Sequence, residues 1–185
     1  MEWTGYDVFD PEVDRPLAEV SRAEARRHFD KLMAEKDERA AALRDLVRRD
    51  AGIEPGGDPD AWLTQVEAWL RDRVEAHPTH ESMLVEEWYS VVNDLALVLG
   101  DLAIEDSPWL SWELCTGGRR NVAFQRPVLM GFRVPNRSYL YDLDRVLGGF
   151  ALALAAGEDE PAPFLTWLRA TLARQAVGDM AGVPR

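Results

Sequence analysis

The sequence has a single cysteine, Cys115, no long hydrophobic run, and only two lysines against nineteen arginines. One cysteine excludes an internal disulfide, and with it the class of small secreted domains held together by disulfide bridges. The longest apolar run, residues 146–156, falls short of the ~18 residues of a membrane-spanning helix and contains two glycines. The first residues lack the basic and apolar regions of a secretory signal. We therefore expect a cytoplasmic protein that makes no membrane contact.

Negative charge dominates the composition, with a formal net charge of −12 at pH 7. A chain of this sign repels nucleic acid and anionic membranes unless positive charge is concentrated locally. With 185 residues, 46% of them hydrophobic, the chain is long enough to bury a core. It has no internal repeat and no dividing linker. We expect one domain over residues 21–176, an N-terminal arm over 1–20 and a C-terminal tail over 177–185.

The arm shows no sustained period and contains two prolines, so we expect an extended segment lying on the domain or a loose terminus. Aromatic residues recur at every third position and would let the arm dock: Trp3, Tyr6 and Phe9.

Capping signals mark several helix ends. Ser21 and Glu24 form a capping box that begins the first helix, and Gly52 ends it. The polar run 35–38 leaves open whether this is one bent helix or two. Asp58, followed by a proline, begins a second, clearly amphipathic helix.

A third helix is predicted from about residue 81 to residue 104, and its middle is apolar nearly all round, which predicts the central helix of the fold. Gly100 would either admit a close neighbour or bend the chain. Four carboxylates lie on one side of this helix, about 100° from its apolar face. They are Glu87, Asp94, Asp101 and Glu105. We expect a solvated flank, although paired carboxylates can also bind divalent cations or perform acid–base catalysis.

After the third helix the apolar period changes from 3.6 to 2, and alternation over residues 110–115 predicts a strand. A turn at 116–118 leads to a returning strand at 121–124, and residues 128–130 predict a third short strand. Two further helices follow, the second opened by prolines. The predicted fold class is α+β, mostly helical, with five or six helices and a small two- or three-stranded antiparallel sheet.

Motifs for catalysis or metal binding are absent from the sequence. His77, His80 and Glu81 surround a proline turn without the ligand set of a zinc site, and His28 stands alone in the first helix. Cys115 has no partner histidine nearby in the sequence and is expected to be a half-buried strand residue. We predict no catalytic residue, no metal and no cofactor.

The most unusual feature is a basic stretch, residues 114–141, in which no acidic residue occurs. We predict that five arginines and one strand tryptophan form a binding face: Arg119, Arg120, Arg126, Arg133, Arg137 and Trp112. Arginine beside aromatic residues is typical of anion sites, protein interfaces and single-strand nucleic-acid platforms. The net negative charge weakens affinity for phosphate backbones, so nucleic acid is the least favoured partner. The alternative is that the arginines form ion pairs within the acidic body.

Residues 94–101 (Asp-Leu-Ala-Leu-Val-Leu-Gly-Asp), followed by Trp112 in a strand and by residues 127–132, resemble parts of uncharacterised bacterial domains. In those domains a helix ending in Gly-Asp or Gly-Glu leads into a small hairpin. Some of them look like immunity or regulatory partners of other proteins. The resemblance implies a binding module and implies no catalytic residues.

We therefore predict a non-enzymatic cytoplasmic binding or regulatory protein, whose Arg/aromatic face binds an acidic protein segment or a small anion. The alternative function is an enzyme that uses carboxylates of the third helix, such as Asp94 and Asp101, with an arginine clamp. A deep pocket joining these carboxylates to Arg119 or Arg126 would favour the enzyme. An open Arg/aromatic face would favour the binding protein.

Overall fold

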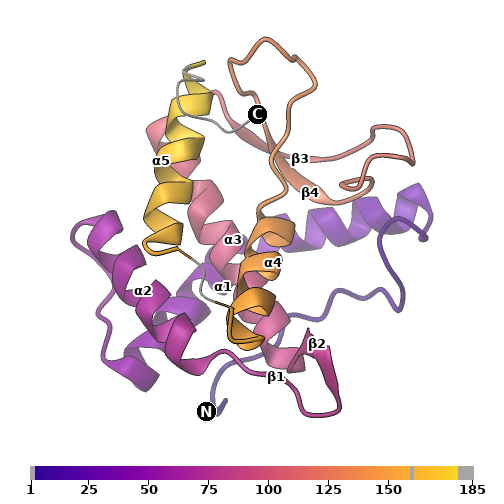
Figure 1. Cartoon of the computed structure of the whole chain (residues 1–185). Helices are drawn as coiled ribbons and strands as arrows, with labels where there is room; N and C mark the ends of the chain where they lie inside the picture. The colour runs from indigo at the N-terminus through magenta and orange to yellow at the C-terminus, as the bar shows by residue number, and fades with distance from the viewer. Residues whose placement is uncertain (1–2, 159–160, 179–185) are drawn as a thin grey trace.

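The computed structural model describes residues 3–158 and 161–178, and within these ranges it contains five helices and two small antiparallel sheets (Figure 1). The helices are α1 (Arg22–Ala51), α2 (Pro59–Arg73), α3 (Glu86–Asp106), α4 (Leu143–Ala155) and α5 (Phe164–Ala176). The strands pair as β1 (Ala76–His77) with β2 (His80–Leu84), and as β3 (Ser111–Leu114) with β4 (Pro127–Met130). The predicted α+β class, mostly helical, is confirmed. Among these residues, no helix combines the length and the hydrophobicity needed to span a membrane.

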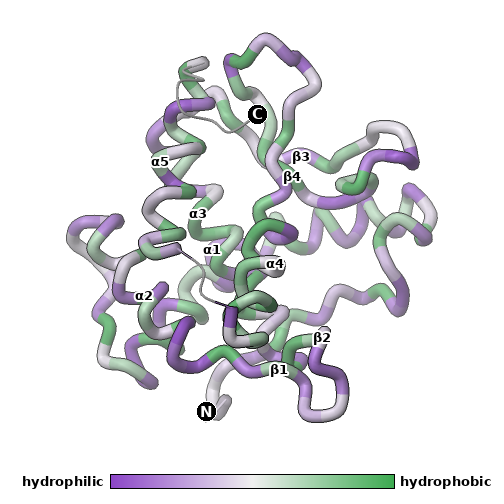
Figure 2. The backbone as a smooth tube through the Cα atoms, in the orientation of Figure 1, coloured by the Kyte–Doolittle hydropathy of each residue, from purple (hydrophilic) through white to green (hydrophobic). Residues whose placement is uncertain are grey.

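α3 is the centre of the fold, as its apolar sequence predicts. Residues 94–100 are all buried, so this part of the helix has no solvent-facing side. α3 packs against α1, α4 and α5, and Figure 1 shows it in the middle of the helices. Figure 2 colours each residue by its hydropathy, and green hydrophobic residues are prominent in α3 and α4, while purple hydrophilic residues are frequent in the outer loops.

Local capping signals set the helix ends. Ser21 accepts a hydrogen bond from the N–H of Glu24, whose carboxylate accepts one from the N–H of Ser21, so the predicted capping box is formed. α1 then continues through the polar run 35–38 as one helix, and Gly52 ends it in the left-handed conformation at φ 67°. Asp58 caps α2 by accepting a hydrogen bond from the N–H two residues further on.

The predicted start of the third helix at residue 81 is wrong. Residues 76–84 form the β1–β2 hairpin, and α3 begins only at Glu86. Pro78 lies in the turn of the hairpin, where its missing N–H removes no ladder hydrogen bond. Leu84 is therefore a buried strand residue. No group of three His, Cys, Asp or Glu side chains in the described ranges has the arrangement to hold a metal ion.

The returning strand predicted at residues 121–124 is also wrong. β3 forms where predicted, but its partner is β4, with Trp112 opposite Leu129. Residues 121–124 turn instead, because the Asn121 side chain accepts a hydrogen bond from the N–H of Ala123. Residues 115–126, here named the basic loop, connect the two strands.

β3 reaches α3 through Trp112 and Gly100. A Cβ atom on Gly100 would lie 2.1 Å from a ring carbon of Trp112, so only glycine lets the indole approach the helix this closely. The indole N–H donates a hydrogen bond of 3.2 Å to Asp101 on the same helix. The predicted close approach at Gly100 is confirmed.

The arm docks through its aromatic side chains, as predicted. The rings of Trp3 and Trp88 meet edge to face, with centroids 5.2 Å apart, and Tyr6 is buried. The ring of Phe9 packs against a histidine of α1. Of the predicted tail, residues 179–185 lie outside the described ranges.

Candidate functional site

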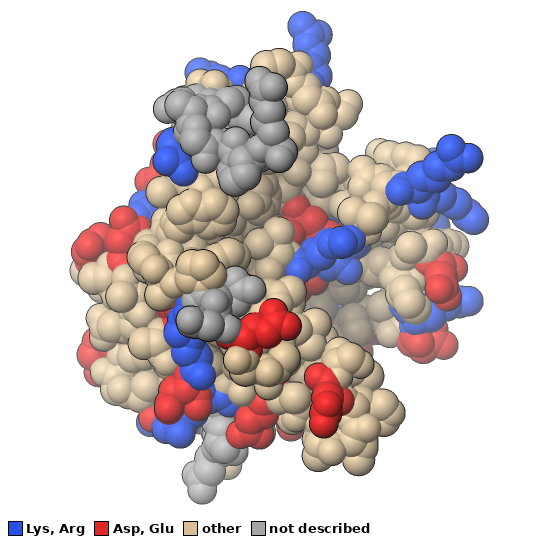
Figure 3. All heavy atoms as spheres, viewed as in Figure 1, with Lys and Arg blue, Asp and Glu red and all other residues tan. Residues whose placement is uncertain are grey.

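The β3–β4 ribbon separates the parts of the predicted Arg/aromatic face. Leu114 pairs with Pro127 at one end of the ribbon, and Ser111 pairs with Met130 at the other. The basic loop leaves the first end and the connection 131–140 leaves the second, and Figure 1 shows the two loops pointing apart. On the face drawn in Figure 3, Lys and Arg occur in separate groups and not as one continuous patch.

Three of the predicted residues lie away from the tip of the basic loop. The guanidinium of Arg133 lies over the ring of Trp109, 3.8 Å from its centroid, in a cation–π contact. Arg137 is exposed in the same connection. Trp112 faces α3, where it contacts Gly100 and Asp101.

Arg126 forms ion pairs at the base of the basic loop. Its Nε donates to Asp142 at 2.7 Å and its Nη2 donates to Asp144 at 2.5 Å. Asp142 also caps α4 by accepting a hydrogen bond from the N–H of Arg145. Burial raises the pKa of the Asp144 carboxyl, against the opposing effect of Arg126. Arg126 thus fits the prediction of arginines paired within the acidic body.

The tip of the basic loop presents Arg119 and Arg120 to solvent. Residues 116–122 are exposed without interruption, and the side chain of Val122 beside the arginines is 68% exposed. Neither guanidinium forms an ion pair with any residue in the described ranges, in contrast to Arg126. The tip therefore carries two adjacent arginines without an ion pair, while the exposed Arg137 lies apart from them in the connection 131–140.

Hydrogen bonds order the loop beneath this exposed tip. Gln125 is buried, and its Nε2 donates to the carbonyl oxygens of Leu17 and Val20 in the arm, at 2.5 and 3.0 Å. The backbone N–H of Cys115 donates to the carbonyl of Arg126 at 2.9 Å, which closes the base. Cys115 is itself buried with Ala123 and Val128, in a small apolar cluster under the loop.

The expected solvated flank of carboxylates on α3 is wrong for Asp94, whose side chain is 0% exposed. Asp94 accepts hydrogen bonds from Arg39 of α1 at 2.9 and 2.6 Å and from the Tyr6 hydroxyl at 2.6 Å. Burial raises the pKa of the Asp94 carboxyl, while the bonds from Arg39 and Tyr6 act to lower it. Asp101 pairs with Lys36 at 2.5 Å. Both carboxylates are thus engaged by α1, and not by the basic stretch.

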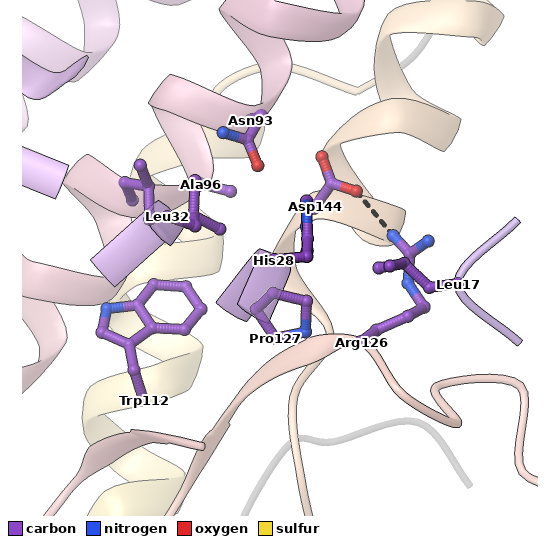
Figure 4. A pocket seen from close by; sticks show the side chains of 10 residues that line it. Leu17, His28, Leu32, Asn93, Ala96, Trp112, Arg126, Pro127 and Asp144 are labelled. Carbon is purple, nitrogen blue, oxygen red and sulfur yellow. Dashed lines mark hydrogen bonds and ion pairs between the residues drawn. The ribbon is translucent and has the colours of Figure 1, made fainter. Parts of the chain in front are cut away.

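A groove runs between the arm, α1, α3 and α4. Its inner chamber has a volume of about 40 Å³ and its outer part about 440 Å³, and the two share Leu17, His28, Asn93 and Asp144 as lining residues. Figure 4 shows the inner chamber, with Trp112 on one side and Asp144 with its Arg126 partner on the other. This groove is the place where chemically distinct side chains from several elements converge.

Two of the predicted site residues, Trp112 and Arg126, line the inner chamber. Sequence reasoning missed the other polar residues there, His28, Asn93 and Asp144. They come from three different helices, so no spacing along the chain relates them. Residues of the arm also line the groove, and they reach it only because the arm docks on the helices.

Comparisons with protein-family models, curated proteins and solved structures give no match to this chain. The resemblance to bacterial helix-and-hairpin domains therefore stays a prediction, and function is inferred below from geometry and charge alone.

Proposed function

We propose that the protein is a non-enzymatic cytoplasmic binding protein, whose basic loop recognises an acidic segment of another protein. The observation that carries this proposal is the pair Arg119 and Arg120, which stand exposed and unpaired on an ordered loop. Ten other basic side chains in the described ranges lie within 4.0 Å of a carboxylate, whereas neither arginine of this adjacent pair does.

Order in the loop supports a binding role, because a segment that is already held in place loses little conformational freedom when a partner binds. The planar guanidinium donates two parallel hydrogen bonds to a carboxylate, so two adjacent arginines suit two acidic side chains. Val122 adds exposed apolar surface beside them. The tip is open, whereas sites for small ions and molecules are concave. An acidic protein segment therefore fits this surface better than a small anion.

The enzymatic alternative lacks comparable support. The carboxylates it would use, Asp94 and Asp101, are engaged by Arg39 and Lys36 of α1. Acid–base work needs a carboxyl group within reach of substrate, and Asp94 is closed to solvent.

Affinity capture from a lysate of the source cell tests the proposal. Wild type is compared with the double variant Arg119→Glu/Arg120→Glu and with a matched control, Arg22→Glu/Arg27→Glu, which makes the same charge change at exposed positions of α1. We expect partners that wild type and control retain equally and that the loop variant loses by about tenfold or more. Capture of the same proteins in equal amounts by all three would reject the proposal.

A second measurement ties the effect to charge. Binding of a purified partner to wild type should weaken as salt rises, because exposed ion pairs are screened. A partner whose affinity does not respond to salt would contradict recognition through Arg119 and Arg120.

A further inference from the structure

The β1–β2 hairpin turns through Pro78 and Thr79 and brings two histidines together (Figure 1). His77 ends β1 and His80 begins β2, and the two residues are paired across the strands. Side chains directly opposite in an antiparallel pair lie on the same face. The two imidazole rings accordingly meet edge to face, with their centroids 5.1 Å apart. The helix start predicted at residue 81 concealed this pairing.

Three donor atoms converge at the turn of the hairpin. The Nδ1 atoms of His77 and His80 lie 3.4 Å apart, and the hydroxyl oxygen of Thr79 lies 3.1 Å from the first and 2.9 Å from the second. The circle through these three atoms has a radius of about 1.8 Å, so a point ~2.0–2.1 Å from all three exists beside their plane. This is the length of a bond from nitrogen or oxygen to Zn²⁺.

The separation of the two nitrogens distinguishes a metal ion from a shared proton. Two nitrogens bound to Zn²⁺ at the tetrahedral angle are about 3.3–3.4 Å apart, which matches the observed 3.4 Å. An N–H group that donates a hydrogen bond usually lies closer to its acceptor, at about 2.7–3.2 Å. The Nδ1 of His77 also accepts a hydrogen bond of 3.3 Å from the backbone N–H of Thr79. This nitrogen therefore carries no hydrogen, as a metal ligand requires.

The turn is open to solvent and lies in an acidic segment. Thr79 and His80 are exposed and His77 is half-buried, so an ion in solution can reach the donors. Residues 74–85 include Glu75 and Glu81 but no lysine or arginine, and the whole chain carries a formal charge of −12. Such a surface attracts cations.

Hydrogen bonds at the base hold the hairpin in place. The N–H of Val85 donates to the carbonyl oxygen of Glu75 at 3.2 Å, and the N–H of Leu84 donates to the hydroxyl of Tyr89 on α3 at 3.1 Å. The side chain of Leu84 is buried in the core. Donors that are already held in position lose little conformational freedom when a ligand binds.

We propose that the hairpin binds a divalent late-transition-metal ion, of which Zn²⁺ is the tetrahedral case, through the Nδ1 atoms of His77 and His80 with the Thr79 hydroxyl beside them. Imidazole nitrogen suits Zn²⁺, Cu²⁺ and Ni²⁺, whereas Mg²⁺ and Ca²⁺ take oxygen ligands. Because coordination bonds hold the ion, it needs no enclosing pocket. In the described ranges no group of three His, Cys, Asp or Glu side chains is arranged for a metal ion, so water completes the coordination. The proposal does not rest on the function proposed above.

Titration of the full chain with zinc chloride, monitored by the imidazole signals in NMR spectra, tests the proposal. The chain has three histidines, and the third, His28, lies in α1 beside the carbonyl oxygen of Pro11. We expect Zn²⁺ to shift or broaden the signals of His77 and His80 and to leave those of His28 unchanged. Magnesium chloride at equal concentration should leave all three unchanged. Signals of His77 and His80 that do not respond to Zn²⁺, or that respond equally to Mg²⁺, would overturn the proposal.

Calorimetry with zinc chloride on two variants locates the ligands. The double change His77→Gln/His80→Gln should weaken Zn²⁺ binding by about tenfold or more, since groups that only orient a metal ligand already contribute about 10–100-fold. His28→Gln removes the remaining imidazole as a control and should leave the affinity unchanged. Equal affinity of wild type and the double variant would assign the ion to other groups and reject the site. The NMR comparison uses wild type alone, so it decides the matter even if the double variant does not fold.

Discussion

Arg39 of α1 and Asp94 of α3, fifty-five positions apart in the chain, form a two-pronged ion pair from which solvent is excluded. Tyr6 of the arm donates to the same carboxylate, and Ser90 accepts hydrogen bonds from both Arg39 and the backbone N–H of Phe9. The pair therefore joins three segments that are distant in sequence. Because a buried charge without a partner is costly, the pair constrains how these segments pack.

Replacing Asp94 with Leu should lower the free energy of unfolding by about 3–5 kcal/mol, because Arg39 would keep its charge in the interior without a partner. Replacing both residues, by Arg39→Met with Asp94→Leu, should cost less than the sum of the two single changes. Urea unfolding measures each loss. The exposed Arg48–Asp45 pair of α1 is the control, and removing it should have little effect. Similar losses at the two pairs would contradict a special role for the buried one.

Gly100→Ala should destabilise the protein by about 1–3 kcal/mol, because the new methyl group would overlap the ring of Trp112. Gly149→Ala is the matched control on α4. A Cβ atom there meets nothing within 4 Å, so this change should stabilise the helix by about 0.5–1 kcal/mol. Thermal unfolding of the two variants should shift in opposite directions. A shift of both variants in the same direction would show that the contact between Gly100 and Trp112 does not decide the effect of Gly100→Ala.

Glu67 of α2 is buried and holds the start of α5. Its Oε2 accepts a hydrogen bond of 2.8 Å from the N–H of Leu165, and its Oε1 accepts one of 2.7 Å from Arg71. The N-cap of α5 is Pro163, which offers no capping side chain. Glu67→Leu should therefore cost about 1–3 kcal/mol of unfolding free energy. Hydrogen exchange at Leu165 should accelerate in this variant, and unchanged protection would argue against the capping role.

Stability should fall steeply as pH rises above about 10, where the tyrosines of the unfolded chain ionise. Burial raises the pKa of Tyr141 to about 12 and also raises the pKa of Tyr6. Between about pH 10 and the raised pKa of each buried tyrosine, the folded chain keeps a proton that the unfolded chain loses. Each such tyrosine therefore removes ~1.4 kcal/mol of stability per pH unit in that range. Below about pH 10 both states keep these protons, and the stability that the buried tyrosines contribute is fully present. Urea unfolding across this range should show a shallower decline for Tyr141→Phe than for wild type, and identical slopes would refute the assignment.

Local signals in the sequence predicted the parts of the fold that depend on neighbouring residues. The capping box at Ser21, the stop at Gly52 and the cap at Asp58 each act within a few positions. The start of α3 was missed because Leu84 suits the apolar face of a helix and a buried strand position equally well. The arrangement of strands at residues 121–130 depended on a side-chain turn at Asn121, which the alternating pattern does not reveal.

The candidate site was less predictable, because its charges are paired through the tertiary structure. A composition free of acidic residues marks the basic stretch, but it does not show that Arg126 turns to α4 while Arg119 and Arg120 remain free of partners in the described ranges. The sequence did contain one signal for the buried pair of Arg39 and Asp94. Asp94 lies in a helix segment apolar nearly all round, and a carboxylate in that position requires a buried partner.

The docked arm has a consequence for the order of events during synthesis. Tyr6 bonds to Asp94, eighty-eight positions later in the chain, so the arm leaves the ribosome long before its docking surface exists. At about 5–20 residues per second, the interval is roughly 4 to 18 s. During that time Trp3, Tyr6 and Phe9 are exposed to the surrounding solution, and they are available to chaperones until α3 has been made.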